Sequence, residues 1–166
     1  MASRIRKLVF YTGFITIAAL TVVWLAETEL SRRDNLKIAQ VHLQQGIRLH
    51  QQKAYLPAKK MLIQATRANP EAWQAFFYLG AGNFELKRYA AAIPFLERAL
   101  SLAPAEQKIY KMLGVVYYKL GKLDMARGYF TAYFELDPDN IDARGMIDMM
   151  AKLQRSTLLA AKEEIN

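Results

Sequence analysis

Hydrophobic positions along the chain follow two different patterns. Residues 8–26 (LVFYTGFITIAALTVVWLA) carry no charge. From about residue 39 onward, apolar residues recur every three or four positions, as they do on one face of a helix. As a helix rising roughly 1.5 Å per residue, the uncharged block would be about 28 Å long, close to the ~30 Å hydrocarbon core of a bilayer. The pattern predicts a hydrophobic helix followed by a helical domain.

We interpret the hydrophobic block 8–26 as an uncleaved transmembrane helix, and the alternative is a cleaved signal peptide. Its apolar run exceeds the ~7–15 residues usual in a signal peptide. Trp24 also occupies a position where cleavage requires a small residue. Tyr11 and Trp24 lie near the two ends of the block, where aromatic rings favour the membrane interface.

Basic residues flank the hydrophobic block on both sides. Three of them lie directly before it, within 4–7, and three lie after it at a greater distance, within 32–37. Because positive charge close to a span favours the cytoplasmic side, we expect the N-terminus in the cytoplasm. The helical domain would then be periplasmic, if the membrane is a bacterial inner membrane.

The helical part contains three stretches of equal length that align without gaps, 39–72, 73–106 and 107–140. They share four columns, which are Gly46, Gly80 and Gly114; Ala58, Ala92 and Ala126; Pro70, Pro104 and Pro138; and the apolar Tyr55, Tyr89 and Leu123. Glycine inside a helix costs roughly 1 kcal/mol, so its column indicates that a neighbouring helix approaches too closely for a side chain. Proline cannot continue a helix and ends each repeat.

Each repeat is therefore predicted to be two antiparallel helices joined by a tight turn. We expect helices near 36–51, 55–68, 71–86, 89–102, 105–120, 123–136 and 140–153. Residues 141–153 begin like another first helix, but Asp148 stands where the glycine column continues. This segment is predicted to be a capping helix, and 154–166 either adds a short helix or is disordered.

The third repeat reads Tyr110-x-x-Leu113-Gly114-x-x-Tyr117, and Ala126-x-x-x-Phe130 and Pro138 follow. This resembles the tetratricopeptide-repeat (TPR) signature with an aromatic residue in place of its Trp. The second repeat departs from the signature at Asn83, and the first departs at His42 and Gln45. The resemblance implies an all-α chain whose repeats form a right-handed solenoid.

The predicted domains are a cytoplasmic stub 1–7, the transmembrane helix 8–26, a connector 27–38, the repeats 39–140 and the capping helix with its tail 141–166. The arrangement is similar to that of bacterial inner-membrane TPR assembly factors.

Candidate chemistry is sparse. The chain has no cysteine, and its net charge of +8 is spread along the sequence. His42 and His50 are eight residues apart, which is too far for the i, i+4 pair of a zinc helix. The glycines sit inside predicted helices and do not form a phosphate loop. We expect no enzyme activity, no cofactor, no metal, no small-molecule substrate and no nucleic-acid partner.

The TPR resemblance implies that first helices line a concave groove. The matching residues are Leu43, Ile47, His50, Gln74, Phe77, Ala81, Phe84, Glu85, Lys108, Lys111, Val115, Tyr118 and Lys119. An apolar and aromatic floor with a basic end suits a peptide or helix that has apolar anchors and an acidic portion. The alternative is that the aromatic residues are ordinary core and the lysines a solvated face.

Chaperone-binding TPR proteins use a clamp of Lys, Asn and Arg side chains. The positions that match its Asn hold Ile47, Ala81 and Val115, which disfavours the binding of chaperone tails. We therefore expect a membrane-tethered adaptor that docks a partner for assembly of a membrane or periplasmic complex. The alternative is a permanent accessory subunit of a larger membrane complex.

Overall fold

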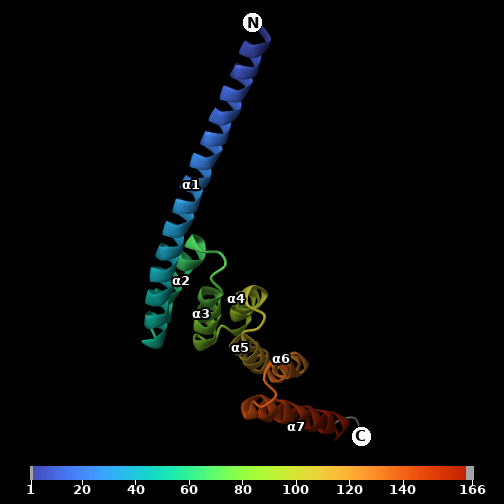
Figure 1. Cartoon of the computed structure of the whole chain (residues 1–166). Helices are drawn as coiled ribbons and strands as arrows, with labels where there is room; N and C mark the ends of the chain where they lie inside the picture. Colours follow the sequence, from blue (N-terminus) through green and yellow to red (C-terminus); the bar gives the residue numbers. More distant parts are fainter. Residues whose placement is uncertain (1, 164–166) are drawn as a thin grey trace. The chain divides into compact units, whose positions relative to one another are not determined.

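The computed structural model describes the backbone of residues 2–163 and the side chains of residues 19–156 and 159. This part of the chain forms seven helices, which are α1 (Ala2–Gln51), α2 (Tyr55–Ala68), α3 (Trp73–Glu85), α4 (Tyr89–Leu102), α5 (Gln107–Lys119), α6 (Leu123–Leu136) and α7 (Ile141–Glu163) (Figure 1). The chain divides into two compact units, Met1–Ile38 and Ala39–Asn166. The predicted all-α class is confirmed.

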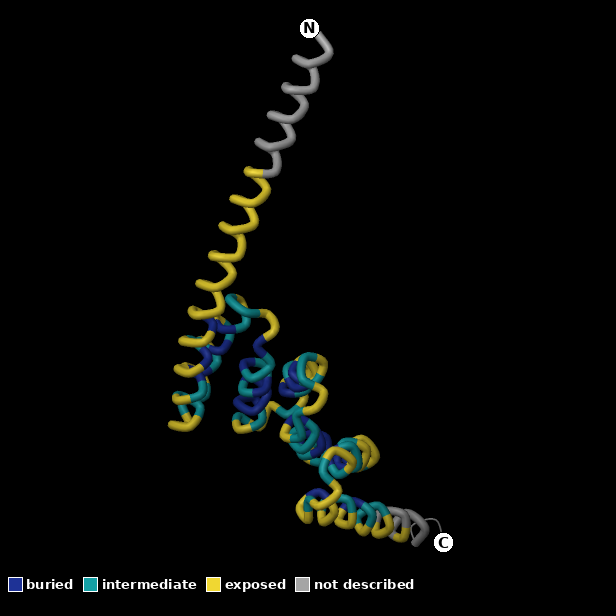
Figure 2. Tube along the Cα trace, in the orientation of Figure 1, coloured by how far each residue is buried: buried dark blue, intermediate teal, exposed yellow. Residues whose placement is uncertain are grey.

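The first unit is helical wherever it is described, including the predicted connector 27–38. Residues 19–38 are all exposed (Figure 2). Exposed ion pairs lie along the connector, where Glu29 is 3.6 Å from Arg33 and Asp34 is 3.3 Å from Lys37. Such pairs at i, i+3 and i, i+4 contribute a few tenths of a kcal/mol each to an isolated helix.

The predicted transmembrane helix 8–26 is described with its side chains only from residue 19 onward. The stub 1–7 and residues 8–18 lie outside the residues whose side chains are described. Among the residues that are described, no helix holds an apolar stretch long enough to cross a membrane.

In the second unit, each helix from α2 to α7 packs against the next one along the chain (Figure 1). One buried cluster joins the first repeat to α3 through Leu43, Leu62 and Leu79. A larger cluster runs from α3 to α7 and includes Leu113 and Phe130. Because the apolar face of each helix is covered by its neighbours, the core extends along the whole series of helices.

The glycine column marks the closest approach of the two helices within each repeat, as predicted. A Cβ atom added at Gly80 would lie 2.6 Å from Cγ of Leu96, and one at Gly114 would lie 2.4 Å from Cε1 of Phe130. Gly46 has the same relation to Leu62. The close contact is thus a large apolar side chain on the second helix, one turn beyond the alanine column.

The turn inside each repeat has one repeated backbone conformation that the sequence pattern did not reveal. Lys53, Lys87 and Gly121 occupy equivalent positions and have φ angles of 60°, 59° and 72°. In each turn three backbone N–H groups donate back into the first helix, as from Ala54 to Leu49 at 2.9 Å. These bonds satisfy carbonyl groups that the end of the helix leaves without partners.

Three of the predicted helices, 55–68, 89–102 and 123–136, match the structure residue for residue. Two predictions were wrong at their starts, because α3 begins only at Trp73 and α5 only at Gln107. The residues after each proline form a turn first. Asn69 Oδ1 accepts a hydrogen bond from the backbone N–H of Glu71 at 3.0 Å, and the N–H of Ala72 donates to the carbonyl of Asn69 at 3.2 Å.

The capping helix is longer than predicted. α7 starts one residue late, with the side chain of Asn140 accepting a bond from the N–H of Ala143 at 3.1 Å, and it continues to Glu163. Residues 154–163 contain neither glycine nor proline, so nothing in the sequence breaks the helix. Gln154 also donates a hydrogen bond to Asp124 on α6, which holds this part of α7 against the third repeat.

Candidate protein-docking surface

The first helices of successive repeats contact one another through residues predicted to line the groove. The ammonium Nζ of Lys108 on α5 lies 4.4 Å from the ring centroid of Trp73 and 5.6 Å from that of Phe77, both on α3. Nζ of Lys111 lies 3.6 Å from Oδ2 of Asp142 on α7. α7 therefore stands in the place of a further first helix, and the row of first helices continues past the third repeat.

Burial separates the predicted groove residues into two groups. Leu43, Phe77 and Ala81 are buried, with 5%, 9% and 4% of their surface exposed. The residues that retain accessible surface are Ile47, His50, Gln74, Phe84, Glu85, Lys108, Lys111, Val115, Tyr118 and Lys119. That these residues bind a partner stays a prediction. Val115 and Tyr118 also pack partly against the core, so they belong to both surface and interior.

We define the docking face as Gln74, Lys108, Lys111, Val115, Tyr118 and Asp142. Four of these lie on α5 at spacings of three or four residues, which places them on one side of that helix. α5 carries three lysines and no acidic residue. The face is thus a cationic and aromatic strip with α3 on one side and α7 on the other.

The lysines of this region have local partners, which the sequence pattern did not show. Lys108 lies 3.7 Å from Oε2 of Glu106, and Lys111 pairs with Asp142. Lys119 lies 5.8 Å from the ring centroid of Tyr118. Exposed ion pairs contribute only about 0–1 kcal/mol, and exposed cation–π contacts about 0.5–1 kcal/mol. A partner's carboxylates can displace such contacts at little cost.

The sequence reasoning missed Asp142, which belongs to the docking face, and Trp73, which contacts that face through Lys108. Asp142 follows Lys108 by one full repeat and so occupies the same position of the repeat. Extending the repeat register into 141–153 would have placed it beside the groove. Trp73 directly precedes the predicted Gln74, and only its contact with Lys108 identifies its role.

His50 lies in an aromatic pocket between the first two repeats. Its ring makes edge contacts with Tyr55 and Tyr78 at centroid distances of 5.2 and 5.3 Å. Its Nε2 atom is buried without a hydrogen-bond partner, beside a cavity of about 10 Å³ that Asn83 and Leu86 also line. Burial lowers the pKa of His50 below its usual value, and the nearby Glu85 carboxylate opposes this in part.

The stability of the domain is expected to fall as the pH drops below the ordinary histidine pKa of about 6.5. Because the pKa of His50 is lowered on folding, the unfolded chain binds a proton more readily than the folded chain does. The neutral ring thus stabilises the fold above that pH, and this contribution is lost as the pH falls through the folded pKa. Urea unfolding of the full chain in uncharged detergent, between about pH 5 and 8, measures how the free energy of unfolding changes with pH.

The matched variant for this experiment is His50→Phe, which keeps an aromatic ring and cannot titrate. Its stability should vary less with pH than that of the wild type. His42→Gln serves as the control, because it removes the second histidine of the chain and leaves this pocket intact. If the free energy of unfolding changed with pH equally in the wild type and in His50→Phe, the result would contradict the assignment of this pH dependence to His50.

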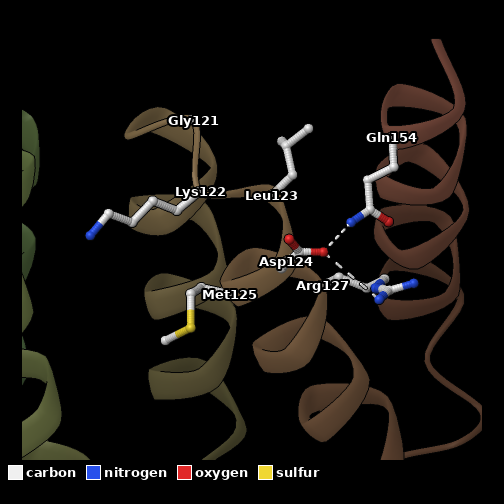
Figure 3. A pocket seen from close by; sticks show the side chains of 7 residues that line it. All are labelled: Gly121, Lys122, Leu123, Asp124, Met125, Arg127 and Gln154. Atoms are coloured by element: carbon white, nitrogen blue, oxygen red, sulfur yellow. Dashed lines mark hydrogen bonds and ion pairs between the residues drawn. The ribbon is translucent and has the colours of Figure 1, made fainter. Parts of the chain in front are cut away.

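A larger hollow of about 830 Å³ lies at the turn between α5 and α6, beside α7 (Figure 3). At its centre Asp124 accepts a hydrogen bond from Gln154 and lies 3.9 Å from Nη2 of Arg127. Lys122 and Met125 point away from this group (Figure 3). The carboxylate of Asp124 is thus already engaged, and its bond with Gln154 joins α6 to α7 at this hollow.

Metal ligation finds no support in the described side chains, since no three His, Cys, Asp or Glu residues among them come together in a way that could hold an ion.

Two stretches of the chain match family models, both described as tetratricopeptide repeat, over residues 36–107 and 83–153. Among curated proteins, the chain is 35% identical over 73 residues to Protein CTR9 homolog of Arabidopsis thaliana, a match over 42% of this chain and 7% of that protein. It is 28% identical over 88 residues to BBSome complex member BBS4 of Mus musculus, over 53% and 17%. The matched stretches are less than a fifth of either relative's length.

Solved structures show the same architecture. The first TPR of Spaghetti (RPAP3) bound to an HSP90 peptide superposes with a TM-score of 0.69 at 22% identity, over 72% of this chain and 95% of that one. MamA (41-end) from Desulfovibrio magneticus RS-1 gives a TM-score of 0.66 at 25% identity, over 75% and 70%. The first likeness concerns the fold alone.

Proposed function

We propose that this tetratricopeptide-repeat protein, whose repeats lie between residues 36 and 153, is a non-catalytic scaffold that binds a protein partner on its docking face. Repeats of this kind stack into extended concave surfaces that serve binding. The observation that carries the proposal is the continuous row of first helices, in which Lys108 contacts α3 and Lys111 contacts α7.

The chemistry of the docking face indicates the kind of segment it would bind. Lys108 and Lys111 stand at the start of α5 and Lys119 at its end, with Val115 and Tyr118 between them. A helix or extended peptide with acidic residues around an apolar anchor would match this order of charges and apolar positions. The lysines would steer the approach, and burial of the apolar anchor would supply affinity.

The same proposal includes a membrane tether formed by residues 8–26. Its support is the uncharged sequence and the exposure of apolar side chains at its described end, where Val22, Val23, Trp24 and Leu25 are 54–65% exposed. We place the protein in a bacterial inner membrane with the repeats in the periplasm, where it would assist assembly of a membrane or periplasmic complex. Extraction at alkaline pH and protease accessibility in sealed vesicles test the tether and its orientation.

Site-specific photocrosslinking in intact membranes tests the docking face. A photoreactive residue placed at Gln74 or Val115 is expected to capture one common partner, identified by mass spectrometry. The matched controls are Gln64 and Ser101, which are exposed on the second helices α2 and α4 and should capture it several times less often.

Equal capture from the two sets of positions would contradict binding on the docking face. A partner that co-purifies in fixed stoichiometry regardless of the docking face, but is lost when residues 8–26 are replaced by an unrelated span, would instead indicate a permanent accessory subunit.

A further inference from the structure

The first repeat carries most of the net positive charge of the repeat domain. Residues 39–72 contain five basic residues and one acidic residue, a net charge of +4, out of +5 for residues 39–140. α2 contributes Lys59, Lys60 and Arg67 and has no acidic residue. The excess is largely specific to this repeat, because residues 73–106 are neutral overall and residues 107–140 carry +1.

Part of this charge forms an exposed stripe on α2 and its preceding turn, which we call the basic face. It consists of Lys53, Leu56, Lys60 and Arg67, all exposed. Leu56, Lys60 and Arg67 are spaced so that they lie on one side of the helix, and Leu56 has 59% of its surface exposed. Within the described part of the chain, none of the three basic residues takes part in an ion pair.

A surface of opposite character lies where α6 ends and α7 begins, and we call it the acidic turn. It consists of Glu135, Leu136, Asp137, Asp139 and Ile141. Two of its members are exposed apolar residues, Leu136 at 40% and Ile141 at 86%. As far as the described side chains show, its three carboxylates lack a basic partner, whereas the neighbouring Asp142 pairs with Lys111.

These two surfaces cannot meet within one molecule. α2 stands near one end of the second unit and the turn between α6 and α7 near the other, with α3, α4 and α5 packed between them (Figure 1). Both surfaces are present in every molecule, and neither includes a residue of the docking face.

We propose that the basic face of one molecule binds the acidic turn of a second copy, head to tail. Three positive charges around an exposed leucine meet three negative charges around two exposed apolar residues. The charges are equal in number and opposite in sign, and the apolar side chains can be buried between them. Because each molecule keeps one free face and one free turn, the contact continues into a ring or an open row of molecules.

Sedimentation of the full chain in uncharged detergent, at about 25 and about 500 mM NaCl, tests this association. The Debye length falls from about 20 Å to about 4 Å over that range, so charge pairing should weaken steeply. The wild-type protein is expected to show at least about twice the monomer's mass at low salt and the monomer's mass at high salt. A wild-type protein that is monomeric at low salt, or associated equally at both salt concentrations, would overturn the proposal.

Paired charge reversals identify the surfaces. Lys60→Glu with Arg67→Glu, and separately Glu135→Lys with Asp139→Lys, should each give a monomer at low salt, because each leaves the molecule with two surfaces of the same sign. All four residues are exposed, so the fold should persist, and circular dichroism checks it. Mixing the two variants should restore association, since each then offers the complement of the other.

The matched control is Lys87→Glu with Arg88→Glu in the second repeat, which changes the net charge equally at exposed positions and should leave association unchanged. Loss of association in this control, or failure of the mixed variants to associate, would overturn the proposal. A charge-reversed variant that stays associated at low salt would also overturn it. A wild type that remains monomeric would point to another occupant of the basic face if Lys60→Glu with Arg67→Glu abolished capture of an acidic protein or binding to vesicles of anionic lipid, and the proposal would again be overturned.

Discussion

Replacing Phe130 with alanine is expected to lower the free energy of unfolding by about 3–5 kcal/mol, the usual range for removing a buried aromatic side chain. Phe130 is 1% exposed and belongs to the large buried cluster that joins α3 to α7. Its removal leaves a cavity between α5 and α6 that the stacked helices cannot easily fill. Urea unfolding of the full chain in uncharged detergent, followed by circular dichroism, measures the change.

The control for this variant is Met125→Ala on the same helix, where the side chain is 47% exposed and the expected change is within about 0.5 kcal/mol. Hydrogen exchange should show which helices lose stability. In Phe130→Ala, amides of α5 and α6 should exchange faster than those of α2, because each repeat contacts only its neighbours. A uniform increase along the chain, or a change no larger than that of Met125→Ala, would show that Phe130 does not have this role.

Replacing Gly114 with alanine is expected to destabilise the protein, because the new methyl group would lie 2.4 Å from Cε1 of Phe130. A buried ring cannot move aside without shifting its own neighbours. Overpacking of this kind costs about 1–3 kcal/mol, while alanine gains about 1 kcal/mol of helix propensity over glycine. The steric cost should be near its upper limit because the contact is so short, which leaves a net loss of about 2 kcal/mol.

Gly128→Ala on α6 is the matched control, because a Cβ atom there would meet nothing within 4 Å. It should stabilise the protein by up to about 1 kcal/mol through helix propensity alone. Combining Gly114→Ala with Phe130→Ala should cost less than the two separate changes added together, since the methyl group then enters the space the ring has left. Opposite signs for Gly114→Ala and Gly128→Ala in urea unfolding are the decisive result, and equal effects would refute the close-contact explanation.

The repeat columns explain why so much of the fold could be predicted. A glycine and a proline that recur once in every repeat fix where two helices touch and where each repeat ends, so α2, α4 and α6 were located residue for residue. The starts of α3 and α5 were less predictable, because the turn after the proline is set by hydrogen bonds such as that from the N–H of Glu71 to Asn69. The length of α7 depends partly on the contact of Gln154 with Asp124, which periodicity does not encode.

The candidate site was harder to predict than the fold. Helical periodicity places Phe77 and Lys108 on neighbouring first helices, but it does not tell a buried ring from an accessible one. Phe77 proved to be 9% exposed. The local partners of the lysines also depend on side-chain positions, and only the structure shows that Lys111 meets Asp142.

Packing between successive helices also has a consequence for how the domain folds. In the described part of the chain, most packing between helices joins sequence neighbours. Contacts beyond the neighbour reach only to the next helix but one, as between α3 and α5 and from Lys111 on α5 to Asp142 on α7. Few contacts therefore require distant segments to meet, and the contact order is low. Helical proteins of low contact order fold in microseconds to milliseconds. We expect the repeats to form rapidly from any adjacent pair of hairpins and to unfold first at their ends, before the α3–α6 centre.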